Sequence, residues 1–143
     1  MLKYPIHVRQ EAQGFVLSSR DLPIMNSVAH TKEEITTEAL DGIATAIMIA
    51  MGDRESIPLP SEALDDEVLV TLPIMMVMKL RLHNEMVKQN VTKAELVRRL
   101  GLGHHKQAWR ILSIDHSTRI EALESAFKVL GKELDIVVSD SGE

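Results

Sequence analysis

Side chains of the types that contact bases and phosphates gather in one stretch, TKAELVRRLGLGHHKQAWRIL, which runs from Thr92 to Leu112. Arginine and lysine can donate to guanine, glutamine can pair with adenine, and histidine can donate to a base or a phosphate. Two amphipathic runs joined by a glycine-marked turn are typical of two short helices that cross steeply. The residues that we expect to contact DNA are Lys93, His104, His105, Lys106, Gln107 and Arg110.

Two other interpretations of this stretch compete with DNA binding. A plain helical hairpin with a solvated polar side has the same spacing. Under either interpretation Trp109 is expected to edge the core, and the alternative is that it lies against the DNA backbone. A metal site on a helix needs ligands three or four residues apart, whereas the adjacent His104 and His105 point in different directions. Because His116 is distant and the chain has no cysteine, we predict no metal site and no cofactor.

Charge divides the chain of 143 residues into two unlike parts. Residues 1–72 contain 5 Lys or Arg against 12 Asp or Glu, and residues 73–143 contain 11 against 9. Within residues 92–119 the count is 6 against 2, although the whole chain has a net charge of −5. The acidic part suits a basic partner and the cationic segment suits a polyanion. That the charges only solvate two surfaces remains open at this point.

Residues 1–72 are predicted to form a β-β-β-α-β module. The strands are expected over Leu2–Val8, Phe15–Ser19, Met25–Ala29 and Glu67–Leu72. Thr31 and Glu34 have the spacing of a capping box, so a helix should start there. The apolar run GIATAIMIAMG in this helix is too short to span a membrane, and the N-terminus has no apolar signal core. We therefore expect a cytoplasmic protein that does not bind a membrane.

Residues 73–143 are predicted to be mainly helical, with Pro73 marking the boundary between the two modules. Four helices are expected, over Ile74–Lys88, Lys93–Leu100, His105–Ser113 and Ser117–Leu130. Thr92 and Glu95 have capping-box spacing at the second of these helices, and Gly131 should end the last one. The segment ELDIVV that follows has the composition of a final strand. The overall fold class is thus α+β.

The order of these elements and several short motifs resemble the HicB antitoxin family over nearly the whole chain. The matching motifs in the first module are Tyr4-Pro5, Gly14-Phe15, Asp21-Leu22-Pro23, Thr31 with Glu34, Glu38-Ala39 and IPLPS at 57–61. In the second module they are ELVRRLG and DHSTRIEALESAFKVLGKEL, the latter at Asp115–Leu134. The resemblance implies a first module like a partial ribonuclease H fold and a second module with a phage-repressor-type helix-turn-helix.

A ribonuclease H-like module raises the possibility of a nuclease, which we consider and reject. Such an enzyme needs several carboxylates that converge on magnesium, with one of them on the first strand. The first strand, KYPIHV, contains no carboxylate, and Glu38 and Asp41 lie on a predicted helix where solvation explains them. No nucleophile motif is present either. We therefore predict no catalytic residues and a binding protein rather than an enzyme.

The resemblance also implies the partners. Proteins of this family neutralise HicA, a small toxin that cleaves messenger RNA, and repress their own operon by binding operator DNA as a dimer or higher oligomer. Asp21, Leu22, Pro23 and Met48 are the residues that we expect to contact such a toxin. The alternative function is a stand-alone helix-turn-helix transcriptional repressor whose first module senses a ligand or only oligomerises. A short neighbouring reading frame for a basic protein would distinguish the two.

Overall fold

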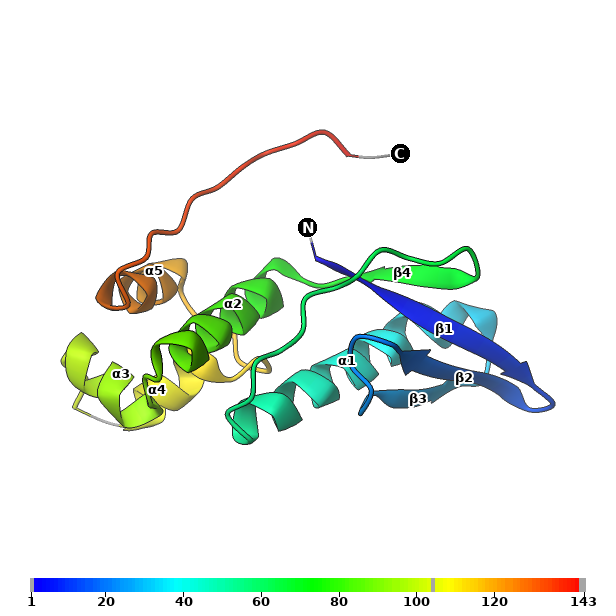
Figure 1. The fold of residues 1–143 in the computed structure, drawn as a ribbon, viewed down its shortest axis with the longest axis horizontal. Coiled ribbons are helices and arrows are strands. Elements are labelled where there is room, and N and C mark those ends of the chain that lie inside the picture. The colour runs from blue at the N-terminus through cyan, green and yellow to red at the C-terminus, as the bar shows by residue number, and fades with distance from the viewer. Residues whose placement is uncertain (1, 104, 142–143) are drawn as a thin grey trace.

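The structure is a computed structural model that describes residues 2–103 and 105–141. It begins with a four-stranded antiparallel sheet of order β3-β2-β1-β4 (Figure 1). The strands span Lys3–Glu11 (β1), Gly14–Ser19 (β2), Asn26–Ala29 (β3) and Glu67–Thr71 (β4). One long helix, α1, lies between β3 and β4 in the chain and covers one face of the sheet (Figure 1). The predicted β-β-β-α-β order is therefore confirmed.

A tight turn at Ala12 and Gln13 sets the register of the first hairpin. The pairing runs from Ile6 opposite Ser19 to Glu11 opposite Gly14. Gly14 has φ +144°, and a Cβ at this position would collide with the backbone carbonyl of Ala29 on the neighbouring segment. Only glycine allows the chain to bend and to approach β3 so closely at this point.

Helix α1 spans Ile35–Gly52 and follows a short 3₁₀ turn at Lys32–Glu34. Its start differs from the predicted capping box, because the Thr31 side chain makes no capping hydrogen bond. The Glu34 carboxylate instead accepts the backbone N–H of His30 at 2.9 Å. At Gly42 a Cβ would meet the side chains of Ser27 and Met25, so the missing side chain lets the helix pack closely against β3 and the loop before it.

The apolar part of this helix is longer than the sequence pattern led us to expect. By length and composition alone, the span Lys32–Gly52 would suffice to cross a membrane, whereas the sequence pattern led us to expect no such span. The structure uses the apolar residues differently, because Ala39, Ile43 and Ile47 are fully buried in the core shared with the sheet.

A second core lies among four helices, α2 (Ile74–Gln89), α3 (Lys93–Leu100), α4 (His105–Leu112) and α5 (Ile120–Val129). Four helices were predicted, but α5 begins three residues later than expected, at Ile120. Helix α2 serves both cores: Met76 and Leu80 pack with the sheet and α1, whereas Leu82 and Met86 pack with the other helices. The C-terminal region is thus helical, and it is joined to the sheet through a shared helix.

Helix α5 ends as predicted, at a glycine with left-handed backbone. Gly131 has φ +76°, and the backbone N–H groups of Gly131 and Lys132 return to the carbonyls of Lys128 and Phe127 at 2.9 Å each. Beyond it, residues 132–141 contain no strand in this single chain, so the expected strand over ELDIVV is not formed. The segment extends away from α5 without a β partner (Figure 1).

Candidate functional site

The predicted DNA-binding stretch forms the helix pair α3–α4. Thr92 caps α3 through its side-chain oxygen, which accepts the backbone N–H of Glu95 at 3.1 Å. The other half of the predicted capping box is wrong, because the Glu95 carboxylate binds Arg98 and Arg99 instead of returning to Thr92. Those ion pairs hold the pKa of Glu95 below its ordinary value, chiefly through the hydrogen bond from Arg98. Part of the local positive charge is therefore already neutralised.

The turn between α3 and α4 depends on Gly101. Its φ of +68° lies in the left-handed region, and the backbone N–H of Leu102 bonds back to the carbonyl of Val97 at 3.1 Å. Leu96 and Val97 from α3 and Ile111 and Leu112 from α4 are buried. The two helices are therefore anchored by their apolar sides, which leaves the opposite side of α4 toward solvent.

Three of the six predicted DNA-contacting residues are exposed and cationic: Lys93 in the first turn of α3, and Lys106 and Arg110 on α4. Lys106 and Arg110 are four residues apart and so share one side of the helix. His105 and Gln107 belong to α4, but their side chains fall outside the described part of the structure, as does His104 entirely. The structure therefore brings two of these cations together on α4 and leaves three of the six predicted residues without a side-chain position.

Trp109 departs from the prediction that it edges the core. Its side chain is 57% exposed, and its ring lies 6.5 Å from that of His116, between centroids, with the planes tilted by 45°. Because Lys106, Trp109 and Arg110 follow the spacing i, i+3 and i+4, the exposed side of α4 combines an indole with two cations. Such a surface suits a phosphate-bearing partner.

The end of α4 is held in place by Lys79, a residue that the sequence did not single out. This α2 lysine is fully buried, and its ammonium group donates to the carbonyls of Arg110, Ser113 and His116 at 2.9, 2.5 and 2.5 Å. It also donates to the Thr118 hydroxyl at 2.8 Å. Carbonyls at a helix C-terminus lack partners within the helix, and a buried cation there satisfies them. Lys79 therefore fixes the position of α4 relative to α2.

Burial lowers the pKa of Lys79, and the nearby Asp115 carboxylate opposes that change. The same pattern occurs at His83 on α2, where burial is the main cause of a lowered pKa. A ring nitrogen of His83 lies 2.6 Å from the carbonyl of Glu55. With a neutral ring this nitrogen is the donor, so His83 ties α2 to the segment that follows α1.

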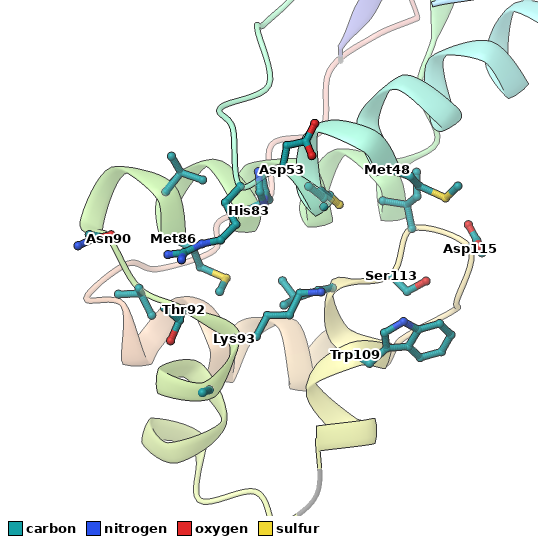
Figure 2. Close-up of a pocket in the computed structure, with 18 residues that line it drawn as sticks. Met48, Asp53, His83, Met86, Asn90, Thr92, Lys93, Trp109, Ser113 and Asp115 are labelled. Carbon is teal, nitrogen blue, oxygen red and sulfur yellow. The ribbon is translucent and has the colours of Figure 1, made fainter. Parts of the chain in front are cut away.

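A pocket of about 910 Å³ lies where α1 ends near the helical region. Met48 and Asp53 line it from α1 and the residue after it, and His83 and Met86 line it from α2, while Lys93 and Trp109 lie across from them (Figure 2). Its lining is mixed, with apolar methionines beside groups of both charges. The pocket touches the edge of the cationic helix pair without containing Lys106 or Arg110.

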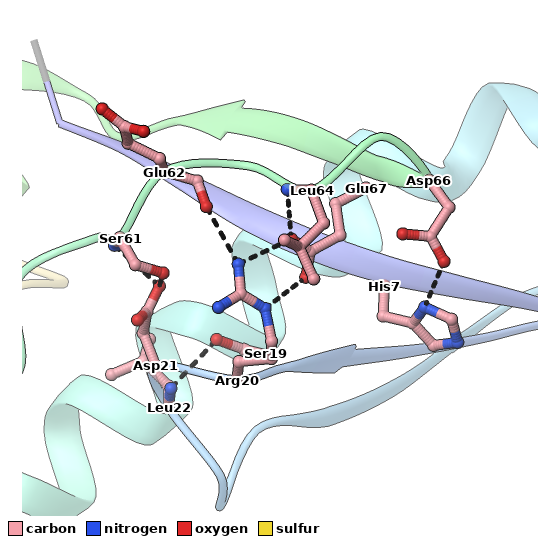
Figure 3. Close-up of polar contacts among 10 residues, drawn as sticks. All are labelled: His7, Ser19, Arg20, Asp21, Leu22, Ser61, Glu62, Leu64, Asp66 and Glu67. Atoms are coloured by element: carbon pink, nitrogen blue, oxygen red, sulfur yellow. Dashed lines mark hydrogen bonds and ion pairs between the residues drawn. The ribbon is translucent and has the colours of Figure 1, made fainter.

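The predicted toxin-contacting residues fall at two places. Asp21, Leu22 and Pro23 lie in the loop after β2, and Met48 is a partly exposed residue on α1. The Asp21 carboxylate accepts the backbone N–H and hydroxyl of Ser61 at 3.0 and 3.1 Å, while Leu22 is buried in the core (Figure 3). Pro23 and the adjacent Ile24 are exposed. The loop is therefore held by Asp21 and Leu22, and it presents the side chains of Pro23 and Ile24 to solvent.

The same loop is braced by an ion pair between Arg20 and Glu67. The two nitrogens of the guanidinium donate to the two carboxylate oxygens at 2.9 and 2.7 Å (Figure 3). The hydrogen bond from Arg20 lowers the pKa of Glu67 to about 2. A bidentate arginine–carboxylate pair fixes orientation as well as charge, so it ties the residue that follows β2 to the start of β4 across the intervening β1.

A small hollow of about 160 Å³ adjoins this loop, lined by Ile24 to Ser27 together with Asp41, Gly42 and Thr45 of α1. β3, which supplies part of this lining, is an edge strand, with Val28 exposed. Edge strands carry backbone groups that are free to pair with another chain. The exposed Ile24 next to Asp41 and the outer edge of β3 are thus available here to a partner. Among the described residues no group of three or more His, Asp or Glu side chains could hold a metal ion.

Comparisons of the sequence with known proteins identify its relatives. A family model for HicB-like antitoxins of bacterial toxin–antitoxin systems matches residues 3–81. Antitoxin HicB 2 of Photorhabdus laumondii is 32% identical over 136 residues, which cover 95% of this chain and 96% of the relative. Antitoxin HicB of Escherichia coli K12 is 30% identical over 138 residues, which cover 96% and 99%. Antitoxin HicB of Pseudomonas fluorescens is 32% identical over 135 residues. Antitoxins of this family are binding proteins rather than enzymes, and the chain belongs to the HicB family.

Proposed function

We propose that this protein is an antitoxin that binds and neutralises a HicA-type toxin in the bacterial cytoplasm. The observation that carries the proposal is end-to-end similarity to proteins named as HicB antitoxins, which covers both the sheet and the helical region. Acidic residues outnumber basic ones by 12 to 5 in residues 1–72, so this part would attract a basic partner such as an RNA-cleaving toxin. We assign residues 1–72, a partial ribonuclease H-like module, to toxin binding.

The surface that we propose for the toxin is the loop after β2 together with the edge strand β3. Pro23 and Ile24 expose apolar side chains in the loop, where Asp41 lines the same hollow as Ile24, and Val28 is exposed on β3. Met48 would extend the contact along α1, whereas Leu22 contributes by holding the loop in the core. Exposed apolar side chains next to an acidic one suit the binding of a compact cationic protein.

A substitution on this surface tests the assignment. Ile24→Arg places a cation where the cationic toxin should dock, so co-purification with the toxin should fall strongly. Ile120→Arg is the matched control, because Ile120 is similarly exposed but lies on α5. Equal loss of toxin from both variants, or from neither, would place the docking surface elsewhere.

We further propose that residues 73–143 act as a phage-repressor-type helix-turn-helix that binds operator DNA as a dimer and represses its own operon. Support comes from the exposed Lys106 and Arg110 on α4, whose other side is buried and whose end is held by Lys79. A reader of this type places the second helix in the major groove and binds paired half-sites. Operator affinity should fall steeply with added salt, since phosphate contacts release counterions. Equal affinity for promoter and unrelated DNA would contradict sequence recognition.

The pocket beside α1 favours one second candidate, a stand-alone repressor whose first module senses a ligand. Its volume of about 910 Å³ would suit a small molecule, and it lies next to Lys93 at the start of α3. The two candidate functions make different predictions about the neighbouring gene. If a short adjacent reading frame encodes a basic protein that stops growth, the antitoxin function holds; if none exists, ligand sensing becomes the better account.

A further inference from the structure

Trp109 is the one tryptophan of the chain, and 57% of its side chain is exposed on α4. Burial of a tryptophan removes roughly 150–250 Å² of surface from water, which normally stabilises a fold. More than half of that gain is not realised within this chain. Tryptophan is also enriched among the residues that contribute most to binding at protein interfaces. The exposed indole therefore marks α4 as a contact surface for another molecule.

Helical geometry places Trp109 on the side of α4 that points away from the protein. At about 100° per residue, Lys106 lies between Trp109 and Arg110, and the three span roughly 100° of the helix circumference. The buried Ile111 and Leu112 lie on the opposite side. The side of α4 that would face a DNA groove therefore carries one flat apolar ring beside two cations.

The segment after α4 sets the position of the indole. The His116 ring lies 6.5 Å from it between centroids, at a tilt of 45°, within the range of favourable aromatic pairs. The His116 carbonyl accepts a hydrogen bond from the buried Lys79 ammonium group, which also donates to the Arg110 carbonyl. One buried lysine thus holds both the end of the helix and the residue beside the ring. The indole is therefore positioned before any partner binds.

We propose that Trp109 contacts the 5-methyl group of a thymine in each operator half-site and so helps to determine which sequence the protein binds. This inference rests on the DNA-binding part of the proposed function and adds a base-specific role for one residue. An apolar ring in the major groove is surrounded by hydrogen-bonding base edges, and the thymine methyl is the apolar group that projects among them. Lys106 and Arg110 on the same side contact polar base edges or phosphates.

Two other surfaces could cover the indole, and each makes a different prediction. The deoxyribose of the DNA backbone is one, and the pocket beside α1, which Trp109 also lines, is the other (Figure 2). A ring against the backbone would strengthen binding to every sequence alike. A ring that only lines the pocket would leave DNA affinity unchanged. The thymine contact is favoured because Trp109 shares its side of α4 with both cations, about one turn from Lys106.

Deoxyuridine tests this contact directly, because it differs from thymidine only by the missing methyl group. Each two-fold related pair of thymines in the protein's own promoter fragment is replaced in turn, and the affinity of the full chain is measured at fixed salt concentration. One pair should weaken binding by roughly fifteenfold, since a buried methyl-sized group is worth about fourfold and two half-sites contribute.

Variants at the same position show whether Trp109 makes the contact. For Trp109→Ala, replacement of that thymine pair should not change the affinity. Trp109→Phe, which keeps an apolar ring, should remain sensitive to it. Ile120→Ala is the matched control, because Ile120 is another exposed apolar residue but lies on α5, and it should keep both the natural affinity and the sensitivity.

Acrylamide quenching gives an independent measurement, since Trp109 is the only tryptophan. Operator DNA should protect its fluorescence from this neutral quencher, and unchanged quenching in the complex would overturn the contact. If no thymine pair loses its effect in Trp109→Ala while the natural chain still prefers its promoter, the thymine contact is wrong and operator recognition stands. If the natural chain binds promoter and unrelated DNA equally, operator recognition and the thymine contact both fail.

Discussion

Replacing Lys79 with methionine should destabilise the helical region and weaken DNA binding, because Lys79 holds the end of α4. Methionine has a similar length and fills the buried space, so the variant removes the ammonium group with little change in volume. The natural side chain donates to three carbonyls and one hydroxyl, which exceeds its three N–H groups. Two of these hydrogen bonds must therefore share one donor.

The loss of stability depends on which hydrogen bonds each acceptor keeps after Lys79 is replaced. The Arg110 carbonyl still accepts the Thr118 hydroxyl at 2.9 Å, and the Ser113 carbonyl still accepts the backbone N–H of His116 at 3.2 Å. The His116 carbonyl has no other hydrogen-bond partner among the described residues. The variant leaves one carbonyl without a hydrogen bond and weakens two others, but it no longer has to bury a charge. We therefore expect the free energy of unfolding to fall by about 2–3 kcal/mol.

Urea unfolding followed by circular dichroism measures this loss. Natural and variant chains must be compared at one protein concentration, because any association between copies would add to the apparent stability. Lys88→Met is the matched control, since Lys88 is exposed on the same helix and its loss should change stability by less than about 0.5 kcal/mol. If Lys79→Met proves as stable as Lys88→Met, Lys79 does not hold α4 in the way described.

Three further outcomes are expected. Alanine at Lys106 or Arg110 should weaken operator binding by about 1–3 kcal/mol if the contact is to a base, whereas alanine at the exposed Lys128 of α5 should change the affinity little. Fluorescence anisotropy with operator DNA measures these affinities. Unchanged affinity for both α4 variants would mean that α4 does not read DNA. Burial lowers the pKa of His83, so the unfolded chain takes up its proton first as the pH falls; the contribution to stability should be complete above about pH 6.5 and decline below it. Glutamine at His83 should flatten that decline in urea midpoints measured between pH 8 and 5, and an unchanged pH profile would contradict the assignment. Alanine at Gly42 should lower the thermal midpoint, with a loss of about 1–3 kcal/mol in the free energy of unfolding, because its Cβ would collide with the side chains of Ser27 and Met25. A midpoint equal to that of the natural chain would show that these side chains can move aside without loss of stability.

Local signals in the sequence were enough to place most of the elements. The alternation before the Gly14 turn, the threonine cap at Thr92 and the glycines at 101 and 131 predict strands, helices and their ends, and the structure confirms them. These features depend on a few neighbouring residues, so a single sequence reveals them. The capping box expected at Thr31 failed for the same local reason, since the carboxylate of Glu34 had another backbone N–H within reach.

Features that depend on distant parts of the chain were not predictable in this way. Lys79 lies in the run MMVMKLRLH, where a lysine reads as the polar side of an amphipathic helix, and its carbonyl partners come more than 30 residues later. Trp109 was expected to edge the core, but Ile111 and Leu112 occupy that side of α4 instead. A final strand over ELDIVV was expected from composition, but residues 132–141 form no strand because no other segment of the described chain pairs with them. In each case the missing information was which segments meet in space.

We expect a short reading frame beside this gene to encode a basic HicA-type toxin, and the growth of cells that express that product tests the central claim most directly. Induction of that protein alone should stop growth, and co-expression of the full chain should restore it, with the two proteins co-purifying as one complex. Growth that stays arrested while both proteins are produced and folded, or a chain that purifies alone, would contradict the account.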